Sequence, residues 1–300
     1  RLDLEFGSEV GWSELLLGMS MFTLMLGMGL TLQGDDFRRI ATSPRATLVG
    51  TVLQLLVMPI VGIAIARFFG LSPVLSSGIV VLAACPGGMF SNMMVHLAKG
   101  NTALSVTLTA TATLVTLFTL PLWVQFSLSL FAVDGTAPLD MPVIDTALRL
   151  GMLTVLPIAI GMGSRIRWPE LAGREQRLTW IGVIGIVVAV TMQGVERPAL
   201  PIDEMLTSIP PALAFAVAAM VIGVAIPLLV RIPPREAITI AVELVVKNTL
   251  LGMVLVGQTL EFEAILPILA FGIFQTPGGL LLLVGWRTLE KRGVLTPAAD

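Results

Sequence analysis

Stretches of about 20 consecutive, mostly apolar residues recur along the whole chain, and each is long enough to cross a bilayer core of about 30 Å as a helix. Charged residues make up only 13% of the 300 residues, and the mean hydropathy is +0.93. Soluble domains carry roughly 25% charged residues, so a soluble globular fold is excluded. The sequence predicts an all-α polytopic membrane protein with short connections and no soluble domain.

We predict nine hydrophobic segments, at 9–32, 45–69, 75–97, 102–131, 141–164, 178–194, 207–230, 236–258 and 263–287. Alternate connections differ sharply in Lys and Arg: one set, with the C-terminal tail, carries 13 and the other carries 3. The 13 are Arg38, Arg39, Arg45, Lys99, Arg165, Arg167, Arg174, Arg177, Arg231, Arg235, Arg287, Lys291 and Arg292. Because basic loops stay in the cytoplasm, we expect a multi-pass protein of the cell inner membrane with its C-terminus inside and its N-terminus outside.

The third segment contains a helix-breaking sequence at Pro86, Gly87 and Gly88, followed by Ser91 and Asn92. Pro lacks a backbone donor and Gly adds no rigidity, so this helix should be interrupted in the membrane. Unwound backbone at membrane depth is tolerated only where it lines a cavity or is buried in protein. A Pro-kinked packing helix is the plainer alternative.

The eighth segment is also polar, with Glu243, Lys247, Asn248 and Thr249 in an otherwise apolar run. It lies five segments after the third, which suggests two inverted five-helix repeats with the first helix absent. The first repeat would be 1–132, with four helices and a broken helix at 75–97. The second would be 133–300, with five helices and a broken helix at 236–258. Paired interrupted segments of this kind mark the binding site of secondary transporters.

Several motifs resemble the bile acid:sodium symporter family: GMGLTL at 27–32, QLLVMP at 54–59, CPGGMFSNMMVHLAKGNTALSVTLT at 85–109 and VELVVKN at 242–248. The resemblance covers nearly the whole chain. It implies a core domain and a panel domain, with two broken helices crossing near the bilayer midplane. It also implies alternating-access transport of an organic anion with sodium, rather than an enzyme.

By this resemblance, one sodium site would use Ser91, Asn92, Ser105, Thr109 and Glu243. All five carry oxygen, the ligand that a hard cation requires. Ser105 and Thr109 are four residues apart and therefore share a helix face, whatever the family. Taken alone, these two would be read as ordinary interhelical hydrogen-bonding residues.

A second sodium site, again by resemblance, would use Gln54, backbone carbonyls around Glu243, Leu244 and Val246, and a side-chain oxygen at position 247. The chain departs from the family here, because Lys247 replaces the usual Gln and Val245 replaces a frequent Gly. A protonated lysine is a donor only and cannot ligate sodium.

We therefore hypothesise that Lys247 is a tethered substitute for the second sodium, with its ammonium reaching Gln54 and the freed carbonyls. Coupling would then fall to the first site alone or vanish. Proton coupling through Lys247 and a structural Glu243–Lys247 pair without a transport role are the alternatives. No covalent cofactor and no metal beyond sodium are expected.

The expected substrate is an organic anion, bile acid-like or a small carboxylate, because helix N-termini that face the crossover carry partial positive charge. The candidate contacts are the amides near Met89 and Phe90, together with Asn248 and, by resemblance, Gln275. The lipid bilayer is the other expected partner, nucleic acid is not, and the sequence leaves the oligomeric state open although a monomer is compatible with it.

Three other classes of protein compete with this prediction. An intramembrane enzyme would have to use Cys85 and His96, which lie eleven residues apart across the break. A channel would show rings of like charge or a repeated filter, and the sequence has neither. A ligand sensor that shares the fold but does not transport stays open.

Overall fold

The computed structural model describes residues 11–32, 44–131, 143–195 and 202–292 of the chain. These ranges are almost entirely helical, and their one piece of β pairing is an isolated two-residue bridge. The predicted all-α architecture is therefore confirmed for the described part. Three predicted boundaries lie outside the described residues. They are the starts of the segments at 9 and at 141, and the division between the repeats at 132 and 133.

In chain order the elements are α1 (Trp12–Thr31), α3 (Pro44–Val52), the π-helical turn η2 (Leu53–Val57), α4 (Met58–Phe68), α5 (Pro73–Ala84), α6 (Met89–Leu97), α7 (Thr102–Phe131), α8 (Val143–Arg167), the 3-10 turn η3 (Pro169–Arg174), α9 (Glu175–Val195), α10 (Ile202–Leu229), α11 (Pro234–Val245), α12 (Thr249–Thr259), the 3-10 turn η4 (Phe262–Ile265) and α13 (Leu266–Lys291).

Five stretches of the described chain are long and apolar enough to cross a membrane: Trp12–Thr31, Pro44–Phe68, Glu175–Val195, Ile202–Leu229 and Phe262–Glu290. Helix α7 adds a sixth if its two halves, which meet at 58°, count as one span. The bend has a local cause, because Pro121 cannot donate to the carbonyl of Leu117 one turn earlier. Helices α5, α6, α11 and α12 are each too short to span alone, so nine crossings stay a prediction.

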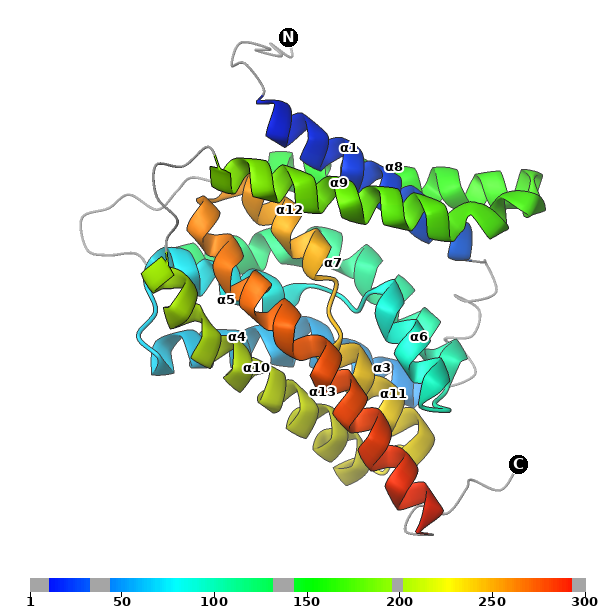
Figure 1. Ribbon diagram of the computed structural model, residues 1–300. Helices are drawn as coiled ribbons and strands as arrows, with labels where there is room; N and C mark the ends of the chain where they lie inside the picture. The colour runs from blue at the N-terminus through cyan, green and yellow to red at the C-terminus, as the bar shows by residue number, and fades with distance from the viewer. Residues whose placement is uncertain (1–10, 33–43, 132–142, 196–201, 293–300) are drawn as a thin grey trace.

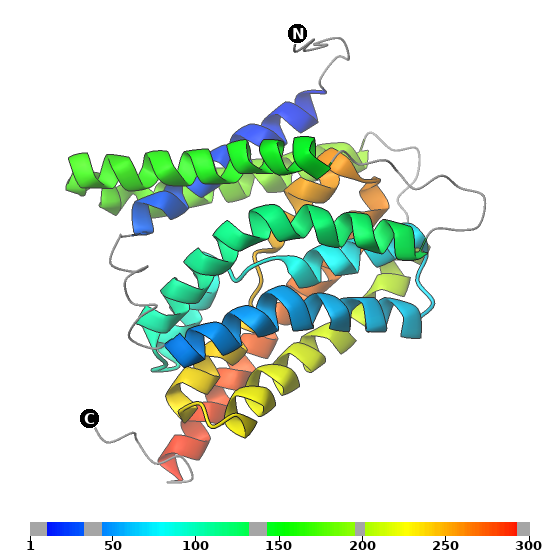
Figure 2. The same ribbon diagram turned by 180° about the vertical axis from the view of Figure 1, so that it is seen from behind.

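The described helices form two layers (Figures 1 and 2). Helix α1 packs against both α8 and α9, and these three form the α1/α8/α9 layer. Their backbones approach closely: a Cβ atom added to Gly29 would lie 2.3 Å from the backbone oxygen of Ile158. Small residues allow such approach between membrane helices. Any larger side chain at position 29 would push α1 and α8 apart.

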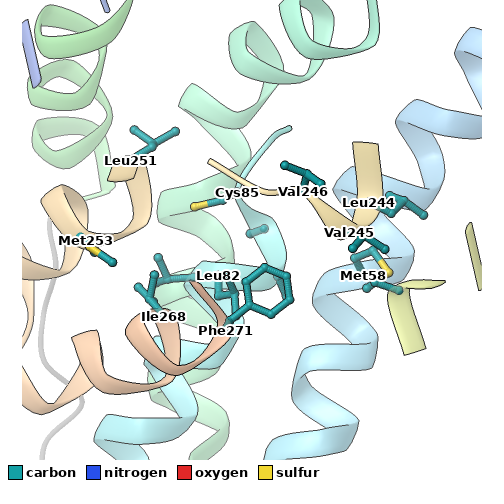
Figure 3. Close-up of a cluster of buried hydrophobic side chains, with 14 of the residues drawn as sticks. Met58, Leu82, Cys85, Leu244, Val245, Val246, Leu251, Met253, Ile268 and Phe271 are labelled. Atoms are coloured by element: carbon teal, nitrogen blue, oxygen red, sulfur yellow. The ribbon is translucent and has the colours of Figure 1, made fainter. Parts of the chain in front are cut away.

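The remaining helices form the second layer, which we name the crossover layer because it contains both interrupted helices, α5–α6 and α11–α12. Figure 3 shows its apolar interior, where Leu82 and Cys85 of the first interrupted helix share one cluster with Val246 of the second and Phe271 of α13. The rings of Phe271 and Phe215 meet edge to face at 5.5 Å. Elements α7 and α12 make the main contacts to the other layer among the described residues.

Four arginines of the basic set hold the ends of neighbouring helices. Each donates to backbone carbonyls at a helix C-terminus: Arg45 to Val230 (2.6 Å), Arg165 to Leu30 (2.7 Å) and Thr31 (2.8 Å), Arg235 to Lys99 (3.2 Å) and Arg287 to Leu97 (2.6 Å). Those carbonyls have no intrahelical donor and carry partial negative charge. These four arginines were predicted to lie on the cytoplasmic side, and the helix ends that they cap were predicted to lie on the same side.

Candidate functional site

The breaks in the two interrupted helices are paired with each other. Helix α5 ends at Ala84 and α6 begins at Met89, while α11 ends at Val245 and α12 begins at Thr249. Gly87 and Lys247 form an antiparallel bridge, and the amide of Asn248 donates to the carbonyl of Pro86 at 2.8 Å. The structure therefore places the first break at Pro86, Gly87 and Gly88 as expected, and the unwound backbone there finds its partners in the second break.

The second break forms without glycine. Val246 follows α11 with φ −101° and ψ 87°, a negative φ that a β-branched residue adopts without strain. This explains how the chain dispenses with the glycine that relatives were expected to have near position 245. Asn248 then caps α12, because its side-chain oxygen accepts from the amide of Leu251 at 3.1 Å. That oxygen is used in the cap rather than presented to a substrate, which the sequence did not predict.

Glu243 lies at the end of α11 with its carboxylate buried and surrounded by hydroxyl groups. Ser91 Oγ donates to it at 2.8 Å and Thr109 Oγ1 at 3.0 Å, and Ser105 Oγ donates to it as well. Asn92 Oδ1 accepts from Ser105 at 2.6 Å. A buried carboxylate is costly without partners, and these three donors satisfy it. All five residues predicted for the first sodium site therefore lie together.

The hydroxyl groups of this cluster have a second acceptor within reach. Ser91 Oγ lies 2.5 Å from the carbonyl oxygen of Gly88, and Ser105 Oγ lies 2.6 Å from Asn92 Oδ1. A hydroxyl has one proton and two lone pairs, so each serine can turn its proton to the neutral carbonyl and direct a lone pair at the carboxylate side. In that arrangement the two serine oxygens join the carboxylate as acceptors, and oxygen acceptors are what a hard cation needs.

Gly87 is required by the position of this carboxylate. A Cβ atom at Gly87 would lie 1.9 Å from Glu243 Oε2. The absence of a side chain thus lets the first break lie directly against the acidic residue of the second helix. The sequence predicted Gly87 as a helix breaker, and the close approach is a second reason for glycine.

Lys247 is buried, and its ammonium binds the opposite interrupted helix. Nζ donates to the carbonyls of Cys85 at 2.9 Å and Ala83 at 3.1 Å. These carbonyls belong to the end of α5, where the break removes their intrahelical donors and the helix dipole is negative. Within the ranges that the structure describes, Lys247 makes no ion pair with Glu243. A simple Glu–Lys pair is therefore not what holds it.

Gln54 is buried in η2, and neither atom of its carboxamide has a hydrogen-bond partner among the described residues. The expectation that Lys247 reaches Gln54 is wrong in this structure, because the free carbonyls of Ala83 and Cys85 bind the ammonium instead. Buried unpaired polar groups are uncommon and call for an explanation. Gln54 thus remains an available donor and acceptor inside the crossover layer.

The π-helical turn around Gln54 was not predicted. Pro59 cannot donate to the carbonyl of Leu55 one turn earlier, and the indole Nε1 of Trp123 on α7 donates to it instead at 3.0 Å. The proline in QLLVMP was the available signal. It indicates a disturbed helix but not the shift to π-helical bonding.

Three further predicted residues lie around the start of the second half-helices. Met89 is the first residue of α6, and Phe90, which follows it, is partly exposed. Gln275 on α13 donates from Nε2 to Thr249 Oγ1 at 3.4 Å, and its Oε1 is buried with no partner in the described part of the chain. Thr249, the first residue of α12, was not proposed as a site residue, although its polarity in an apolar run was a signal.

Two interrupted helices that meet around a buried carboxylate and ammonium, in a bundle with several helices able to cross a bilayer, are typical of membrane transporters. The Sodium Bile acid symporter family model matches residues 18–197, more than half of the chain. The chain belongs to this family of transporters, as the motifs predicted, and is an integral membrane protein and not an enzyme.

Curated relatives resemble the chain over almost its whole length. The uncharacterized sodium-dependent transporter YocS of Bacillus subtilis (strain 168) is 28% identical over 97% of this chain and 89% of its own length. The probable sodium/metabolite cotransporter BASS2 of Oryza sativa subsp. japonica, a chloroplastic protein, is 29% identical over 98% of this chain and 68% of its own. The ileal sodium/bile acid cotransporter of Cricetulus griseus is 26% identical over 92% and 80%.

Proposed function

We propose that the chain is a secondary active transporter of organic anions that works by alternating access. Its relatives include a probable sodium/metabolite cotransporter, a sodium-dependent organic anion transporter of Homo sapiens and a sodium/bile acid cotransporter, so a bile acid-like or small carboxylate substrate is the expected cargo. The N-termini of α6 and α12 both begin at the paired breaks, where free amides and partial positive charge favour an anion. Phe90, Asn248 and Gln275 flank these helix starts.

The proposed architecture is a pair of inverted repeats, 1–132 and 133–300, with nine crossings and the C-terminus in the cytoplasm. The α1/α8/α9 layer would be the panel and the crossover layer the core. Corresponding positions of α5–α6 and α11–α12 support the repeat. The arginine caps support the orientation, since they gather basic residues at helix ends predicted to share one side.

Sodium is proposed as a co-transported substrate at the Ser91, Asn92, Ser105, Thr109 and Glu243 cluster. The donor set fits a hard cation once the serine protons turn to Gly88 and Asn92. The site lies where both interrupted helices meet, so a cation there would draw them together. Its release would free them, which is the link between ion binding and alternating access.

The second cation is proposed to be Lys247 itself. The observation that carries this is the pair of hydrogen bonds from its ammonium to Ala83 and Cys85, which join the second interrupted helix to the carbonyl end of the first. A charge attached to the chain cannot leave with the substrate. The second site would therefore stabilise the crossover in every state without coupling to the sodium gradient, and one sodium ion would remain per cycle.

Sodium-binding stoichiometry tests this proposal. Saturable binding of radioactive sodium to purified protein should give one ion per chain for the wild type and two for Lys247→Gln, which puts an amide oxygen in place of the ammonium at position 247. Lys99→Gln makes the same chemical change at an exposed residue and should leave one ion. One ion in Lys247→Gln, or two in the wild type, would contradict the proposal that Lys247 takes the place of the second sodium ion. No bound sodium in the wild type would instead favour proton-coupled or uncoupled transport.

Transport itself is tested with proteoliposomes. Labelled taurocholate and pyruvate represent the two substrate classes, and uptake should rise when sodium replaces choline outside. Binding of either anion without any accumulation would indicate a ligand sensor instead.

A further inference from the structure

A groove at one end of the α1/α8/α9 layer has no part in the transport site. It lies where α1 and α8 end and η3 leads into α9, which Figures 1 and 2 both show at the same end of that layer. Its volume is about 340 Å³, within the roughly 300–1,000 Å³ range of small-molecule sites. The paired breaks of the crossover layer do not contribute to its lining.

Two exposed arginines form its charged edge. Arg174 ends η3 and Arg177 lies in the first turn of α9, and both are exposed. Neither guanidinium has a hydrogen bond or ion pair within the described ranges, whereas the neighbouring Arg165 is bound to the end of α1. Residues 165–177 hold four basic residues, Arg165, Arg167, Arg174 and Arg177, and two acidic ones, Glu170 and Glu175, so this segment is net positive.

Apart from the arginines and Ser164, the groove is lined by apolar residues, and it continues along the exposed face of α9. Leu26, Leu30, Leu178 and Ile181 line it. Ile184 and Val188 extend the same helix face away from the arginines, since residues three, four and seven apart share one side of a helix, and both are exposed. A ligand for this surface needs a negatively charged end and a long apolar end.

Trp168 gives the level of this site in the membrane. It is exposed at the junction of α8 and η3, next to the arginines in the chain. Tryptophan gathers at the membrane–water interface, where lipid headgroups lie. We therefore expect Arg174 and Arg177 at headgroup level, with Ile181, Ile184 and Val188 extending into the hydrocarbon.

We propose that this groove binds an anionic phospholipid, with its phosphodiester on Arg174 and Arg177 and an acyl chain along α9. Guanidinium groups match phosphate oxygens in pairs, and basic pockets between membrane helices on the cytoplasmic side recognise lipid phosphates. The bound lipid would join α8 and α9 at the end of the layer where α1 also ends.

Quenching of tryptophan fluorescence by brominated lipid tests the proposal on the full chain in vesicles. A Trp12→Phe, Trp286→Phe background leaves Trp168 and Trp180 near the groove and Trp123 in the core. Dibrominated phosphatidylglycerol should bind roughly tenfold more strongly than dibrominated phosphatidylcholine, because two arginines contact the headgroup. Equal quenching by the two lipids would overturn the proposal.

Substitutions distinguish lipid binding in the groove from a general attraction between basic residues and anionic lipid. Arg174→Gln with Arg177→Gln should abolish the preference, while Arg174→Lys with Arg177→Lys should keep most of it and shows that the region still folds. Arg231→Gln with Arg292→Gln removes the same charge from exposed residues elsewhere on the predicted cytoplasmic side and should leave the preference intact. A preference that survives the first pair, or is lost in the last, would contradict the assignment. Displacement of the lipid by millimolar sodium glycerophosphate would also overturn it, because the site would then recognise a soluble anion.

Discussion

Glu243 and Lys247 are close in sequence but satisfied by different partners. The carboxylate accepts from three hydroxyl groups, and the ammonium donates to two backbone carbonyls of α5. A charge buried in the membrane is costly unless it is paired or hydrogen-bonded, and here each charge has its own set of bonds. Replacing either residue therefore leaves the hydrogen bonds of the other in place, although the two buried charges still attract each other.

Ser105→Ala tests the first site at the level of a single oxygen. It removes a donor to the buried carboxylate and should lower the free energy of unfolding by about 1–3 kcal/mol. It also removes a ligand from the proposed sodium site. The sodium concentration that half-saturates the rise in melting temperature, measured against choline chloride, should therefore increase about tenfold, the equivalent of about 1.4 kcal/mol.

Ser129→Ala is the matched control for this experiment. Ser129 lies on the same helix, but it is exposed, and its hydroxyl donates to the carbonyl of Phe126 on that helix. The control should leave both the melting temperature and its sodium dependence close to the wild type. The site assignment would fail if Ser105→Ala and Ser129→Ala responded to sodium alike.

At the scale of elements, the paired breaks act as one unit because backbone from each helix completes the other. The two adjacent glycines of the first break offer a sharp comparison. A Cβ at Gly87 would lie 1.9 Å from Glu243 Oε2, but one at Gly88 would come no closer than 3.6 Å to Asn248. Gly88 has φ −108°, which any residue can adopt.

We therefore expect Gly87→Ala to displace the carboxylate, abolish the sodium-dependent rise in melting temperature and stop uptake. Gly88→Ala should retain both. The measurements are thermal unfolding in sodium and in choline, and uptake by proteoliposomes. Similar behaviour of the two variants would mean that the breaks tolerate separation and that the close contact at Gly87 does not matter for function.

The sequence predicted these elements better than it predicted their contacts. Pro86, Gly87 and Gly88 mark a break because Pro and Gly act locally, and Ser105 and Thr109 share a face because helix periodicity is local. The partner of Lys247 could not be predicted, since Ala83 and Cys85 lie more than 160 residues away in the chain and meet it only through the crossing of two helices. The hydrogen bond from Trp123 to the carbonyl of Leu55 in the π-helical turn could not be predicted either, because the two residues are far apart in the chain and meet only through helix packing.

At the scale of the whole molecule, the proposed alternating access would require the α1/α8/α9 layer and the crossover layer to change position relative to each other. The first layer is suited to move as a unit, because its helices approach so closely that side chains larger than glycine would not fit at Gly29. The contact between layers includes Leu17 of α1 and Gly257 of α12, where an added Cβ would lie 2.9 Å from Leu17 Cδ2.

A crosslink between the layers should therefore stop transport, and one within a layer should not. In a Cys85→Ala background, which has no other thiol, Leu17→Cys with Gly257→Cys is joined by a short bis-methanethiosulfonate reagent. Uptake of taurocholate or pyruvate, whichever the wild type accumulates, should fall to the level of empty liposomes and return on reduction.

Gly27→Cys with Thr179→Cys is the control within the α1/α8/α9 layer, where an added Cβ at Gly27 would lie 3.1 Å from Thr179 Oγ1. This crosslink joins α1 to α9, which we expect to move together, so uptake should continue. Transport that persists with the two layers joined would exclude relative motion of the layers as the mechanism. Transport that stops with only α1 and α9 joined would show that this layer must deform, and the cycle would then depend on rearrangement within the layer.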